Sequence, residues 1–185
     1  MISFTTSSEK DLPGILELQQ QNLKGNLSAD EIHSQGFVTV SHSLEDLQKM
    51  SLHERHVVIK DAEKIAGYIL AMTKFSKVDI PVLVPMFESF ETINYNHKPV
   101  SKYNYLVVGQ VCISKEYRGK GLLNQCYAEY KNHFKQKYDF AITEIDATNL
   151  RSLNAHKKIG FKEIHRYEEP TGKQWSIVVW DWKEN

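Results

Sequence analysis

Apolar residues recur along this chain with two spacings, one typical of strands and the other typical of helices. Short runs rich in β-branched and aromatic residues predict strands at 2–5, 57–60, 65–72, 106–113, 140–147, 161–167 and 174–182. Apolar residues three or four positions apart predict helices at 12–23, 28–34, 43–52 and 86–93, and two more that begin after residues 121 and 149. For residues 36–41, a strand and an extended connector both fit the pattern.

Local signals place several ends of these elements. Ser43 and Asp46 have the spacing of a capping box, in which each side chain accepts a hydrogen bond from the other residue's backbone amide. Residues 61–64 form a short connection between two strands, and Gly67 in the second strand predicts a β-bulge. Gly160 predicts a left-handed end to the last helix, and the apolar Phe161 follows it.

Strands and helices alternate through the middle of the sequence, which then ends in a pair of strands. Parallel pairing is expected between the strands at 106–113 and 140–147, because a helix separates them. The chain has 185 residues, enough for one domain with a substantial core. We therefore expect a single α/β (α+β) domain over residues 1–185.

The composition narrows the classes of partner. Lysine plus arginine and aspartate plus glutamate both number 23, which argues against a general nucleic-acid-binding protein. No apolar run reaches the roughly 18 residues that a membrane-spanning helix needs. Cys112 and Cys126 are isolated and lack the spacing of a metal or redox pair, as is typical of a reduced, cytoplasmic protein. We expect no nucleic acid, membrane or metal among its partners.

The most informative stretch is the turn Arg118-Gly119-Lys120-Gly121, which lies between an apolar strand and an amphipathic helix. Backbone N–H groups at the start of a helix attract anions, and glycines let a diphosphate approach them closely. Arg118 can bind two phosphate oxygens at once, and Lys120 adds a second positive charge. The pattern predicts a phosphate site, although a solvated basic turn would contain the same residues. The spacing fits neither a P-loop nor a dinucleotide fingerprint.

Two blocks of the sequence together resemble the GNAT N-acetyltransferase superfamily. Arg118 and Gly121, after the strand end Val111-Cys112-Ile113, are similar to its acyl-CoA-binding motif, Arg/Gln-x-x-Gly-x-Gly/Ala. Asn149-Leu150-Arg151-Ser152 and the run from His156 to Phe161 are similar to its next motif, in the same order and spacing.

The resemblance implies a GNAT-like domain with a mixed, mostly antiparallel sheet, two parallel strands that separate at their carboxyl ends, and helices on both faces. It also implies that acetyl-CoA enters the gap as a co-substrate, with its diphosphate at the glycine turn. Two positions depart from the family pattern: Leu123 stands where glycine or alanine is usual, and His156 stands where many members have tyrosine. The residues expected to bind acetyl-CoA are Val111, Cys112, Ile113, Arg118, Gly119, Lys120, Gly121, Leu122, Leu123, Asn124, Asn149 and His156.

The implied reaction is direct transfer of an acetyl group from acetyl-CoA to an amine of a small molecule or peptide. The amide of Val111 is expected to stabilise the oxyanion, with help from Gly109 and Gln110 if the strand bulges there. His156, with a reference pKa of about 6.5, is the expected general acid for the CoA thiolate. Glu144 is the expected general base, and the alternatives are Glu88, Glu91 and Tyr105.

Other residues have structural interpretations that compete with chemical ones. Cys112 alternates with its neighbours along the strand, so we expect a buried thiol rather than an acyl carrier. His53 and His56 lack a third metal ligand and are expected on the surface. The three tryptophans near the end of the chain are expected to close the core or to support a homodimer contact; they are Trp175, Trp180 and Trp182.

Two questions stay open at the level of sequence. The weakly patterned residues 74–102 could form a wall of the acceptor site or could cover the sheet. The same fold could also serve as a non-catalytic acyl-CoA sensor or scaffold, and the glycine turn could hold the phosphates of another nucleotide.

Overall fold

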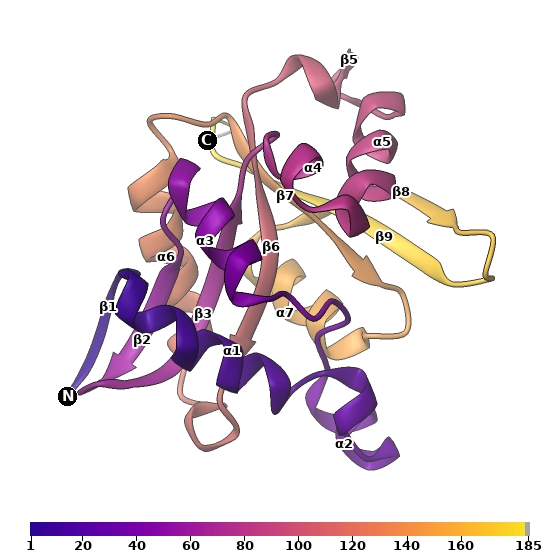
Figure 1. Cartoon of the computed structure of the whole chain (residues 1–185). Helices are drawn as coiled ribbons and strands as arrows, with labels where there is room; N and C mark the ends of the chain where they lie inside the picture. Colours follow the sequence, from indigo (N-terminus) through magenta and orange to yellow (C-terminus); the bar gives the residue numbers. More distant parts are fainter. Residues whose placement is uncertain (184–185) are drawn as a thin grey trace.

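The computed structural model describes residues 1–183 and contains a seven-stranded sheet, with strand order β1-β2-β3-β6-β7-β9-β8 (Figure 1). The last two residues of the expected domain lie outside this range. Every strand predicted from the sequence is present. The strands of this sheet are β1 Ile2–Thr6, β2 Val57–Asp61, β3 Lys64–Met72, β6 Tyr105–Ile113, β7 Phe140–Asp146, β8 Lys162–Glu168 and β9 Gln174–Asp181.

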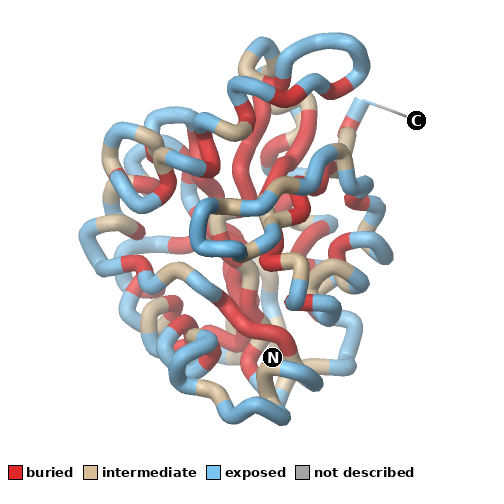
Figure 2. The backbone as a smooth tube through the Cα atoms, turned by 90° about the vertical axis from the view of Figure 1, so that its right-hand side faces the viewer, coloured by how far each residue is buried: buried red, intermediate tan, exposed pale blue. Residues whose placement is uncertain are grey.

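Helices cover both faces of this sheet, and the strands between them are buried (Figure 2). One face packs against α1 Leu12–Gln20, α3 Leu44–His53 and α5 Val84–Thr92, with the short α4 Ser76–Asp79 beside them. The other face packs against α6 Leu122–Phe134 and α7 Leu150–Ile159. The remaining helix, α2 Ala29–Gln35, contacts α7. In the described part of the chain, none of these helices has the length and apolar character to cross a membrane.

The local signals in the sequence are confirmed. Ser43 Oγ accepts a hydrogen bond from the Asp46 amide at 3.1 Å, and the Asp46 carboxylate accepts one from the Ser43 amide at 2.8 Å. The register of β2 and β3 shifts beside Gly67, as expected for a bulge. Gly160 has φ +118° and ends α7 in the left-handed region, which a residue with a side chain rarely adopts.

One helix boundary was predicted wrongly. α1 ends at Gln20 rather than at residue 23, because the backbone that follows makes other hydrogen bonds. Val38 N–H donates to Asn22 C=O at 2.9 Å, and Lys24 N–H donates to Val38 C=O at 3.0 Å. The segment 36–41 is therefore a connector, and its strand-like pairing is limited to an isolated bridge between Leu23 and Val38.

The parallel strands β6 and β7 pair for only three residues each, 105–107 with 140–142. Thr143 Oγ1 adds one more link, donating to Val108 C=O at 2.8 Å. Just beyond it, the register of β3 and β6 shifts between Val108 and Val111, which confirms a bulge near Gly109 and Gln110. From there to their carboxyl ends, β6 and β7 run apart and leave a gap in the sheet.

Residues 74–102 cover the sheet at the end remote from the glycine turn. Phe90 on α5 is fully buried and meets Tyr105 at 5.8 Å between ring centroids, edge to face. Tyr95, in the two-stranded hairpin of β4 Asn94–Tyr95 and β5 Lys98–Pro99, contacts Phe140 in the same way at 5.5 Å. Both contacts lie at the amino ends of β6 and β7, which supports the covering role.

Two expectations about surface and core residues need correction. His56 is fully buried rather than on the surface. In the interior, its Nδ1 accepts a hydrogen bond from the Ala71 amide at 3.2 Å. Within residues 1–183, no group of three potential metal ligands comes together. Trp180 and Trp182 do close the core beside α6, but Trp175 lies apart, with its Nε1 donating to Glu169 at 3.2 Å.

Candidate active site

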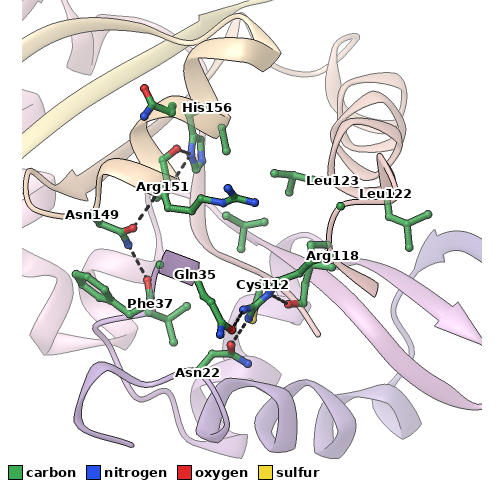
Figure 3. Close-up of a pocket in the computed structure, with 18 of the residues that line it drawn as sticks. Asn22, Gln35, Phe37, Cys112, Arg118, Leu122, Leu123, Asn149, Arg151 and His156 are labelled. Carbon is green, nitrogen blue, oxygen red and sulfur yellow. Dashed lines mark hydrogen bonds between the residues drawn. The ribbon is translucent and has the colours of Figure 1, made fainter. Parts of the chain in front are cut away.

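A cleft of about 390 Å³ opens where β6 and β7 separate (Figure 3). Its walls are the glycine turn with the start of α6, the amino-terminal half of α7, and the segment that follows α2. The size falls in the range of about 300–1,000 Å³ that is usual for small-molecule sites. Every residue expected to bind acetyl-CoA lines this cleft except Lys120, whose Nζ lies 5.4 Å from the centroid of the Tyr117 ring.

The glycine turn leaves the backbone amides at the start of α6 open. Gly119 and Gly121 have φ +75° and +74°, and a Cβ at either position would meet no protein atom within 4 Å. No side chain caps the start of α6, and within the described chain no group accepts a hydrogen bond from the backbone amides of residues 119–124. These amides and the positive end of the helix dipole therefore suit a diphosphate.

Arg118 is held by hydrogen bonds within the protein that were not expected from the sequence. Its guanidinium donates hydrogen bonds to the side chains of Asn22 and Gln35, and its Nε donates to Ile113 C=O at 2.8 Å (Figure 3). The side chain thus ties the turn to the ends of α1 and α2, and most of its donors are already used. Phosphate binding by its side chain stays a prediction.

The charge of the cleft comes in part from residues that sequence reasoning missed. Arg151 and Lys158 on α7 line the cleft together with Arg118, and no aspartate or glutamate is among the described residues that line it. Arg151 belongs to the first part of the second sequence block, so its place next to Asn149 was the available signal. Three cationic side chains without a carboxylate give the cleft a potential that favours an anion.

The backbone of Val111 faces the gap. Ser114 N–H donates to Ala66 C=O at 2.9 Å, and antiparallel pairs alternate in the direction of their hydrogen-bonding groups. The backbone groups of Val111 and Ile113 consequently point away from β3, and the Ile113 carbonyl accepts the hydrogen bond from Arg118. Val111 therefore has both backbone groups available to an extended ligand in the gap.

Cys112 behaves as a structural thiol, as expected. Its side chain packs into the core on the side of α1, whereas Val111 and Ile113 pack against the opposite core. It is 7% exposed, and burial raises the pKa of the thiol to about 12. A thiol of this kind is almost entirely protonated at neutral pH and is a poor nucleophile.

A second, smaller cavity of about 70 Å³ adjoins the cleft at Val111. It lies between residues 37–40, the bulge of β6 and the carboxyl half of β7, and Trp175 lines its edge. The acidic residues that line it are Glu144 and Asp146, both on β7. The sequence held no signal for the place of residues 37–40, because a connector can approach a sheet from many directions.

Glu144 is the one expected base that lines this cavity. Burial raises its pKa to about 7, although the hydrogen bond from Tyr167 Oη at 2.7 Å and the nearby Lys173 act in the opposite direction. The alternatives lie elsewhere: Glu88 is exposed, Glu91 pairs with Lys77 at 2.8 Å, and burial raises the pKa of Tyr105 to about 12. A carboxylate with a pKa near 7 is suited to accept a proton at neutral pH.

His156 lines both cavities, but its surroundings argue against the expected role as proton donor. The side chain is 3% exposed, and burial lowers its pKa to about 4, so the ring is neutral at pH 7. Nδ1 lies 2.8 Å from Ser152 C=O, and Nε2 lies 2.7 Å from Tyr127 Oη. This pairing was not visible in the sequence, since Tyr127 lies 29 residues away on α6.

Asn149 links the two walls of the site. Its Oδ1 accepts a hydrogen bond from the Ser152 amide at 3.2 Å and so caps α7, while its Nδ2 donates to Phe37 C=O at 2.9 Å. Asparagine is a common cap at the start of a helix, whereas the bond to Phe37 depends on the fold. Asn149 therefore positions the site through both ends of its amide, and its contact with a ligand remains a prediction.

Comparison with known proteins agrees with this architecture. The model of the acetyltransferase (GNAT) family matches residues 27–161. A search of curated proteins found no match. An acetyltransferase of the GNAT family from Streptococcus agalactiae has a TM-score of 0.68 and 13% identity, with 99% of this chain and 96% of that chain covered.

Two further solved structures have the same fold. The ribosomal-protein-S18-alanine N-acetyltransferase from Escherichia coli has a TM-score of 0.62 and 13% identity, over 98% of this chain and 94% of its own. A Salmonella typhimurium protein solved with acetyl-CoA has a TM-score of 0.62 and 11% identity, over 100% of this chain and 95% of its own. Because the family model spans most of the sequence and includes both the glycine turn and α7, the chain belongs to the GNAT acetyltransferase family.

Proposed function

We propose that this protein transfers an acetyl group from acetyl-CoA to an amine of a small molecule or peptide. The observation that carries the proposal is the pairing of two cavities at Val111. One has cationic residues and open backbone amides, and the other contains Glu144 with a pKa near neutrality. An anionic thioester and an amine would meet where the cavities join.

In this proposal, the diphosphate of acetyl-CoA binds the amides after Gly119, and the pantetheine arm lies beside β6 like an added strand. The Val111 N–H then donates to the carbonyl oxygen of the thioester and stabilises the negative charge that develops there. Arg118 keeps the turn in place through its bonds to α1 and α2, while Arg151 and Lys158 supply charge at the cleft.

The acceptor amine must lose a proton before or during attack. An amine with a pKa of about 10.4 is neutral only about once in 2,500 at pH 7, a handicap of about 4.6 kcal/mol. Glu144 accepts this proton, directly or through a water molecule. The neutral nitrogen then forms a bond to the carbonyl carbon and loses its second proton to solvent, the carbon–sulfur bond breaks, and CoA leaves as a thiolate.

Acceptor-dependent release of free CoA thiol tests the proposal. Purified protein is incubated with acetyl-CoA and a panel of peptides, amino acids, polyamines and aminoglycosides, with a reaction lacking acceptor as the control. We expect at least one amine to accelerate thiol release, and Glu144→Gln to abolish most of that acceleration. Tight CoA binding without any acceptor-dependent release would instead favour the acyl-CoA sensor, and tighter binding of ATP or NAD than of CoA would reject both.

A further inference from the structure

Six residues line both the cleft and the second cavity and so surround the point where thioester and amine would meet; they are Phe37, Val38, Val111, Asn149, Ser152 and His156. Three of these have polar side chains. The inference that follows rests on the proposed function and asks which side-chain proton is available to the thioester at this junction.

His156 has no proton to offer, and Asn149 already donates one of its two amide protons within the protein. That proton of Asn149 Nδ2 is bonded to Phe37 C=O, and the same side chain is fixed at its other end by the Ser152 amide. A neutral imidazole has one proton and one lone pair. A carbonyl can only accept, so the 2.8 Å contact with Ser152 C=O places the ring proton on Nδ1, and Nε2 accepts from Tyr127. Both ring nitrogens of His156 are therefore engaged within the protein.

Ser152 is different. Its Oγ lies 3.3 Å from His156 Nδ1, and because Nδ1 carries the proton, the hydroxyl can only accept there. Within the described chain no group accepts the hydroxyl proton of Ser152. The residue is also well positioned, since Asn149 caps its amide and its carbonyl holds His156, one helical turn further along the same face of α7.

We propose that the Ser152 hydroxyl donates a hydrogen bond to the sulfur of the bound thioester while the carbon–sulfur bond breaks. The carbonyl oxygen of the thioester accepts a hydrogen bond from the Val111 N–H on the opposite wall. The sulfur then faces α7, where Ser152 lies. The electron pair of the broken bond goes to sulfur, Glu144 has taken the proton of the amine, and Ser152 keeps its own proton. The thiolate gains a proton from solvent after release, and His156 is a positioning residue that orients Ser152.

Binding tests the position of the hydroxyl without any turnover. Calorimetry compares CoA with desulfo-CoA, which lacks the sulfur, on the wild-type protein, Ser152→Ala and the exposed control Lys157→Ala on the same helix. A neutral hydrogen bond predicts that wild type and Lys157→Ala bind CoA about 2- to 10-fold more tightly than desulfo-CoA. Ser152→Ala should bind the two equally. If the ratio of CoA affinity to desulfo-CoA affinity is the same in all three proteins, the assignment is overturned.

Kinetics tests the role in catalysis. With the amine found by the acceptor screen, Ser152→Ala should lower kcat about 10- to 100-fold, as expected for a hydrogen bond to a developing charge, with KM for acetyl-CoA within about twofold. Ser152→Thr, which retains a hydroxyl, should recover most of the rate. An unchanged kcat in Ser152→Ala, or an equal loss in both variants, would refute the role. A wild-type protein inactive with every amine would reject the proposed function instead, and the calorimetry would still decide the position of Ser152.

Discussion

Replacement of Gly121 by alanine separates the folding role of the glycine turn from its binding role. The residue has φ +74°, and the left-handed region costs a residue with a Cβ about 1–2 kcal/mol. Gly172, in the turn between β8 and β9, has φ +84°, and a Cβ there also meets no protein atom within 4 Å. The two alanine variants should therefore lose similar stability. At about 2–4 °C per kcal/mol for a chain of this size, both should melt about 2–8 °C lower.

Of these two glycines, Gly121 lines the cleft and Gly172 does not, so the two variants should differ in CoA binding. A methyl group between the diphosphate and the turn removes at least one charge-assisted hydrogen bond, worth about 1.5–3 kcal/mol. Calorimetric titration should give a Kd for CoA about 10- to 150-fold higher in Gly121→Ala and unchanged in Gly172→Ala. If both variants bind CoA as the wild type does, the diphosphate does not lie on this turn, and the reasoning from open amides is wrong.

Three other predictions concern single side chains. The acetylation rate should rise with pH and show an inflection near pH 7 as Glu144 loses its proton, and Glu144→Gln should lack this inflection and turn over about 100-fold more slowly. Burial lowers the pKa of His42, His56 and His156 to about 4, so the unfolded chain binds more protons below pH 6.5. Denaturant unfolding should show a stability loss of about 2 kcal/mol per histidine between about pH 7 and pH 5, whereas equal stability would contradict these shifts. Tyr127→Phe leaves Nε2 of His156 without a donor and should lower the free energy of unfolding by about 1–3 kcal/mol, with CoA affinity retained.

Features with local causes could be predicted from the sequence. The positive φ of Gly121 and of Gly160 follows from residue type and position, and the capping box at Ser43 needs only residues three apart. The separation of β6 and β7 was implied by the resemblance. The bulge near Gly109 interrupts the register between β3 and β6 just beyond the three residues at which β6 pairs with β7, and this favours the separation.

Contacts between distant parts of the chain decided what the sequence could not. The sequence could not show that Asn22, 96 residues away, and Gln35 accept hydrogen bonds from the Arg118 guanidinium. The role of His156 was implied by the resemblance and assumed its reference pKa, which burial under α6 changes. Glu144 was the expected base, but its raised pKa could not be predicted, because that pKa depends on the burial that the surrounding elements impose.

A crystal structure with bound CoA would test the central claim most directly. The account predicts the diphosphate on the backbone amides of residues 119–123, the pantetheine arm in the gap between β6 and β7, and the sulfur between Val111 and Ser152. CoA bound outside this gap, or bound within it with the diphosphate away from the glycine turn, would contradict the account.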